Sequence, residues 1–150
     1  AARQAMDAAG KTAEDIDLVI VSCAYTERSY PAIAIEVQHE LGIRGTGFDM
    51  LVACSAATFA LQRAYDAIAA GSARAVLVIN PELTSPQVNY RDRDSHFIFG
   101  DVSTAMVLEQ AQSCTSAHAY DVLGTRSQTV YSNNIRSIFG YLAYAQDIDP

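Results

Sequence analysis

Apolar and polar residues alternate along the chain in blocks that predict strands and helices in turn. Two short runs rich in β-branched residues, at 18–22 and 75–79, are typical of strands buried on both faces of a sheet. Apolar residues at helical spacing lie between these two runs, first from 33 to 41 and then from 59 to 68. This alternation of strands and helices predicts an α/β protein with a mainly parallel mixed sheet and helices on both faces.

Weaker patterns complete the predicted elements. Gly10 closes what looks like the end of a helix, and Pro31 fits the first turn of the helix that Gly42 ends. Further strands are expected at about 47–52, 105–108 and 120–129. The first residues look like the middle of a helix, so we interpret residues 1–150 as one partial domain of a longer protein.

Composition excludes several classes of partner. The formal net charge of −7 argues against a nucleic-acid partner, which normally requires a basic face. No stretch reaches the roughly 18 apolar residues of a membrane span, so no membrane partner is expected. The spacing of Cys23, Cys54 and Cys114 matches no zinc pattern, and we predict no metal site. Three cysteines that cannot all pair indicate a reducing cytoplasm.

Cys54 lies where a predicted strand runs directly into a helix of small residues. Unsatisfied N–H groups and the helix dipole favour negative charge at such a corner, which raises the fraction of nucleophilic thiolate. The small neighbours Ser55 and Ala56 leave space for a substrate. A free cysteine is more often a small core residue, and the spacing alone leaves both readings open. Cys23 and Cys114 lack such a corner and are interpreted as core residues.

Five short motifs occur in an order that resembles one enzyme family. They are Asp15-Ile16-Asp17 with its strand, Tyr30-Pro31 before a helix, Phe48-Asp49 leading to Cys54-Ser55-Ala56, Ala70-Gly71-Ser72 before the next strand, and Asp92-Arg93-Asp94 with Phe99-Gly100-Asp101. Together they resemble the β-ketoacyl-acyl-carrier-protein synthase III enzymes of the thiolase superfamily. The resemblance covers about residues 1 to 109 and is weaker beyond.

The resemblance implies the N-terminal half of a thiolase-like fold and a condensing acyltransferase. Cys54 would take an acyl group from acyl-CoA, a substrate rather than a bound cofactor, and pass it to malonyl-acyl carrier protein after decarboxylation. Initiation of fatty-acid synthesis is the leading process. A condensing enzyme of secondary metabolism and a non-catalytic thiolase-like subunit remain alternatives. A cysteine hydrolase of another fold is a weaker one, because no histidine is well placed.

The same resemblance suggests binding residues. Arg93 would contact the nucleotide end of coenzyme A, since a guanidinium suits phosphate, although a salt bridge to Asp92 or Asp94 is an equal alternative. The remaining residues assigned to the substrate pocket or to the contact of a homodimer are Tyr30, Thr84 and Phe99. A plain core or interface role is the alternative for Tyr30.

Other positions depart from the family. Its catalytic His and Asn belong to a later segment, so His39, His96 and His118 are given ordinary roles, and we expect these residues alone to be inactive. Residues 102–105 replace several glycines, which indicates a divergent subgroup. The segment 132–136 matches no general family feature.

Overall fold

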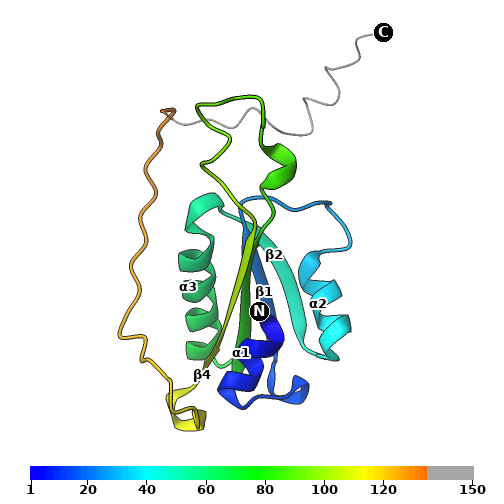
Figure 1. The fold of residues 1–150 in the computed structure, drawn as a ribbon. Helices are drawn as coiled ribbons and strands as arrows, with labels where there is room; N and C mark the ends of the chain where they lie inside the picture. Colours follow the sequence, from blue (N-terminus) through cyan, green and yellow to red (C-terminus); the bar gives the residue numbers. More distant parts are fainter. Residues whose placement is uncertain (135–150) are drawn as a thin grey trace.

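The computed structural model describes residues 1–134, and its centre is a four-stranded sheet (Figure 1). In spatial order the strands are β2 (Thr46–Leu51), β1 (Leu18–Cys23), β3 (Ala75–Glu82) and β4 (Val102–Glu109). β1 pairs in parallel with β2 and β3, while β4 runs antiparallel to β3. The predicted mainly parallel mixed sheet is therefore confirmed.

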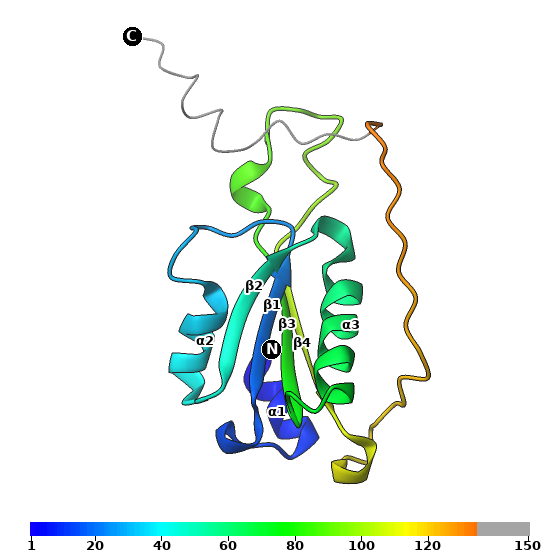
Figure 2. The ribbon, with the colours of Figure 1, turned by 180° about the vertical axis from the view of Figure 1, so that it is seen from behind.

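Helices cover both faces of the sheet, as the sequence predicts (Figures 1 and 2). They are α1 (Ala2–Ala9), α2 (Ile33–Leu41) and α3 (Ala56–Ala69). α1 and α2 pack on the face that carries Val19 and Val21, whereas α3 packs on the face that carries Ile20. Alternate side chains of β1 thus enter two apolar layers, which explains its nearly continuous apolar sequence.

Small residues bring α3 close to the sheet. Ala56, Ala60 and Ala64 recur every fourth position, and all three are buried. Side chains at this spacing share one helix face, so their small size allows the helix backbone to approach the strands. In residues 1–134, no helix combines the length and apolar character needed to cross a membrane.

The start of α2 differs from the prediction. The helix begins at Ile33 with Ala32 as its N-cap, so Pro31 lies outside its first turn and follows a cis peptide bond from Tyr30. Asp49 of β2 supplies the cap instead: its carboxylate accepts the N–H groups of Ile33 and Ala34, both at 2.8 Å. A side chain distant in sequence therefore decides where this helix begins.

The prediction of a strand at 120–129 is wrong. These residues form no strand in the structure and run as extended chain beside α3 (Figures 1 and 2). The Ser127 hydroxyl donates a hydrogen bond to Gln62 of α3. A strand needs a ladder partner, and within residues 1–134 this segment has none. Of the unplaced segment 132–136, residues 135 and 136 lie outside the described part of the chain.

Candidate active site

Cys54 lies in a short turn at the carboxyl end of β2. A 3₁₀ turn (Ala53–Ser55) separates β2 from α3, so the cysteine precedes the helix rather than forming part of its first turn. The residue is exposed. An exposed thiol in a turn suits a group that must meet a substrate, and it contradicts the alternative of a buried core cysteine.

The backbone of this turn is strained at Ala53. Its φ of 48° lies in the left-handed region, which costs a residue with a Cβ about 1–2 kcal/mol. Such a conformation persists when surrounding contacts fix the backbone. Here the Val52 N–H donates to the Cys23 carbonyl at 3.2 Å, and the Ser55 N–H donates to the Val52 carbonyl at 3.2 Å.

A buried polar pair adjoins the start of α3. The Ser22 hydroxyl donates to the carbonyl of Ala56 at 3.0 Å, and the Asn80 amide donates to the Ser22 carbonyl at 3.0 Å. Pairing of β1 with β3 ends at Val21 and Ile79, just before Pro81, which has no N–H to continue the ladder. The Asn80 side chain therefore takes the place of the missing backbone donor.

The loop from 83 to 101 is closed at its base. The backbone N–H groups of Thr84 and Ser85 both donate to Asp101 at 2.8 Å, and the Thr84 hydroxyl donates to the Gly100 carbonyl at 3.0 Å. Hydrogen bonds from Ser85, together with those from Thr84, hold the pKa of Asp101 below its usual range. The hydroxyl of Thr84 is thus engaged at the loop base.

Tyr30, Arg93 and Phe99 lie on loops that leave the same edge of the sheet as Cys54, because the carboxyl ends of parallel strands share one edge. Tyr30 is 84% exposed and Phe99 is 62% exposed. Within the described chain, no hydrogen bond or ion pair joins these three side chains to one another or to Cys54. Within the same residues, Arg93 forms no ion pair with Asp92 or Asp94, the alternative role considered for it.

The other cysteines differ from Cys54. Burial raises the pKa of the Cys23 thiol to about 11, and this thiol donates to the Tyr25 carbonyl at 3.1 Å. Cys114 is half-buried, and no disulfide joins any of the three cysteines. Among residues 1–134, no cluster of His, Cys, Asp and Glu could hold a metal ion.

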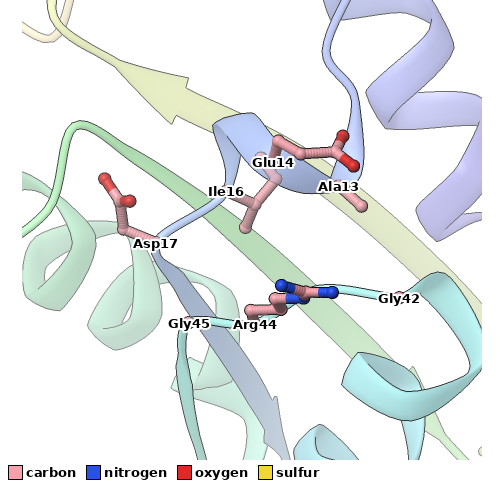
Figure 3. Close-up of a pocket in the computed structure, with 7 residues that line it drawn as sticks. All are labelled: Ala13, Glu14, Ile16, Asp17, Gly42, Arg44 and Gly45. Atoms are coloured by element: carbon pink, nitrogen blue, oxygen red, sulfur yellow. The ribbon is translucent and has the colours of Figure 1, made fainter.

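A separate cavity of about 430 Å³ lies at the opposite end of the sheet, where β1 and β2 begin (Figure 3). Its lining includes Glu14, Arg44 and Asp17. Asp17 is already held by Arg74, whose guanidinium approaches its carboxylate to 2.7 Å. Because the cavity lies where β1 and β2 begin and Cys54 follows the end of β2, the cavity is not part of the site around Cys54.

The family model for 3-oxoacyl-[acyl-carrier-protein (ACP)] synthase III matches residues 48–129, which include Cys54 and the loop 83–101. The chain belongs to this family. A beta-ketodecanoyl-[acyl-carrier-protein] synthase of Pseudomonas aeruginosa is 54% identical over 147 residues, which are 98% of this chain and 42% of the relative. A beta-ketoacyl-[acyl-carrier-protein] synthase III of Methylococcus capsulatus is 41% identical over 74% of this chain and 35% of its own length.

Two solved structures, a synthase III and a priming β-ketosynthase, share the fold. The enzyme from Aquifex aeolicus aligns with a TM-score of 0.72 and 34% identity over 75% of this chain and 37% of its own. The priming β-ketosynthase of the R1128 polyketide pathway aligns with a TM-score of 0.69 and 37% identity, over 71% of this chain and 32% of its own. The predicted half of a thiolase-like α/β fold is thus confirmed. The chain spans less than half the length of these relatives.

Sequence reasoning missed Ser22, Asn80 and Asp49. The pair Asn80-Pro81 carries a usable signal, because a proline at the end of a strand leaves a carbonyl without its ladder donor. No local pattern reveals the contact from Ser22 to Ala56, since 34 positions separate the two residues.

Proposed function

We propose that the protein is an acyltransferase that forms an acyl-cysteine at Cys54 and condenses it with malonyl-acyl carrier protein. Family membership together with the exposed turn at Cys54 supports this proposal. The Cys54 thiolate attacks the thioester carbonyl, and the bond to coenzyme A breaks so that coenzyme A leaves as its thiolate, which takes a proton from water. Malonyl thioester then loses carbon dioxide, and the enolate carbon attacks the acyl group. The bond to Cys54 breaks and the thiolate is regenerated.

The relative from Pseudomonas aeruginosa suggests the acyl chain. Its name specifies a β-ketodecanoyl product. Two of the ten carbons of that product come from malonyl thioester, so the acyl donor must supply eight. We therefore propose octanoyl-CoA as the preferred donor, so that fatty-acid synthesis is initiated from a medium-length acyl chain.

The substrate contacts are assigned by position. Arg93 is exposed and carries no ion pair among residues 1–134, so its guanidinium is available to bind the phosphates of coenzyme A. We propose that Thr84 and Phe99, on the loop after β3, border the acyl chain. No permanently bound cofactor enters this scheme.

We also propose that the protein forms a homodimer in the cytoplasm, where acyl-CoA and acyl carrier protein would meet it. β2 is an edge strand, and its Phe48 and Leu51 are 41% and 57% exposed. An unpaired edge with apolar side chains favours pairing with another chain. Tyr30 would then reach toward the acyl site of the partner subunit.

The test is intact mass spectrometry of the whole protein, purified as its native organism produces it, after incubation with acetyl-CoA or octanoyl-CoA. An octanoyl adduct should form on the wild type and on Cys114→Ser but not on Cys54→Ser, and faster than an acetyl adduct. Added malonyl-acyl carrier protein should remove it and yield β-ketodecanoyl-acyl carrier protein. A preference for acetyl-CoA would overturn the proposal that the donor carries an eight-carbon acyl chain. No adduct from either donor would favour the non-catalytic subunit.

A further inference from the structure

Two consecutive residues at the carboxyl end of β1 hold both sides of the turn that carries Cys54. On the strand side, the Val52 N–H donates to the Cys23 carbonyl at 3.2 Å. On the helix side, the Ser22 hydroxyl donates to the Ala56 carbonyl at 3.0 Å. The turn is thus attached to the central strand just before and just after the cysteine.

The attachment on the helix side is firm. Ser22 is fully buried, so water cannot replace its hydroxyl as a partner of the Ala56 carbonyl. The Ser22 carbonyl accepts the amide of Asn80, which is 8% exposed. Strand β1, strand β3 and the first residue of α3 are therefore joined through one serine.

The strained backbone makes this attachment important for the thiol. Ala53 occupies the left-handed region at φ 48°, and the turn can relax if either side is released. Relaxation would rotate the peptide groups next to Cys54 and displace its sulfur. Displacement of a reacting atom by about 1 Å can lower a rate by about a hundredfold.

We propose that Ser22 is a positioning residue, whose hydroxyl fixes the first turn of α3 and thereby the place of the Cys54 sulfur. The proposal rests on Cys54 being the acylated nucleophile. Ser22 contacts no substrate in this scheme. Its removal should therefore lower the rate of acylation without changing the concentration of acyl-CoA that gives half the maximal rate.

An exposed serine just beyond the other end of the same helix offers a control for the loss of one hydroxyl. The Ser72 hydroxyl donates to the Ala67 carbonyl at 3.0 Å, at the end of α3 remote from Cys54. Ser22→Ala and Ser72→Ala each remove one hydroxyl bound to one carbonyl of α3. Ser22→Thr retains the hydroxyl and adds a methyl group at this buried site. A recovered rate in this variant would therefore assign the loss in Ser22→Ala to the missing hydrogen bond.

The test measures acylation of the whole protein at saturating octanoyl-CoA and alkylation of Cys54 by iodoacetamide across pH, with thermal unfolding of each variant. In Ser22→Ala we expect acylation to fall about tenfold and the alkylation profile of Cys54 to change. Ser72→Ala should behave as wild type, and Ser22→Thr should recover most of the rate.

Two results would overturn the proposal. One is wild-type acylation and alkylation in folded Ser22→Ala, whatever its melting temperature. The other is an equal loss in Ser72→Ala. If the wild type forms no acyl adduct, the proposed function fails, and the comparison of alkylation between the two alanine variants still decides whether Ser22 positions the sulfur.

Discussion

Asp49→Ala should loosen the start of α2. In the structure, the two carboxylate oxygens of Asp49 accept the N–H groups of Ile33 and Ala34, each at 2.8 Å. Removal of a helix-capping side chain costs about 1–2 kcal/mol, and the charge also interacts favourably with the helix dipole. Because Asp49 is half-buried, water cannot fully replace it, and we expect a loss of about 2 kcal/mol.

Hydrogen exchange at single-residue resolution measures this loss where it arises. About 2 kcal/mol corresponds to about thirtyfold faster exchange of the Ile33 and Ala34 amides, if they exchange by local opening of the helix start. Asp66→Ala is the matched control, because within residues 1–134 the Asp66 carboxylate pairs only with Arg63, on the exposed side of α3. Its effect should stay below about 0.5 kcal/mol. Unchanged exchange at the two amides in Asp49→Ala would show that the cap does not hold the helix.

Two further predictions concern the opposite end of the sheet. A Cβ on Gly45 would lie 2.1 Å from the Asp17 carbonyl oxygen, so Gly45→Ala should cost about 3 kcal/mol in urea unfolding. Gly124→Ala, which meets open space, should change stability by less than about 0.5 kcal/mol, and equal effects would refute the clash. The Arg74 guanidinium holds the pKa of Asp17 below its usual range, so the unfolded chain binds this proton more readily. Stability should therefore fall as pH drops below about 4, and a similar slope in Arg74→Met would contradict that cause.

The fold was predictable wherever local pattern and packing agree. The apolar runs at β1 and β3 predict buried parallel strands, and Gly10 and Gly42 end helices with φ of 64° and 72°. Prediction failed where a distant group decides. Asp49, which lies on strand β2, sets the start of helix α2. Residues 120–129 have a strand-like sequence but no pairing partner in the described chain.

The candidate site was predictable in part. The change from strand to helix around Cys54 locates the turn, because both patterns are visible in the sequence. The left-handed backbone of Ala53 leaves no such signal, since alanine rarely adopts it. The contact from Ser22 to Ala56 depends on how α3 lies across the sheet, which only the folded chain defines.

The closed base of the loop 83–101 has a consequence for how this family diversifies. Thr84 and Asp101 join the two ends of the loop by a hydrogen bond. The geometry of the sheet therefore does not depend on the residues between them. Doubling the length of a flexible loop costs only about 0.6 kcal/mol in closure entropy. Insertions and replacements between these two residues can therefore accumulate without loss of foldability, and the surface beside Cys54 can evolve separately from the framework that supports it.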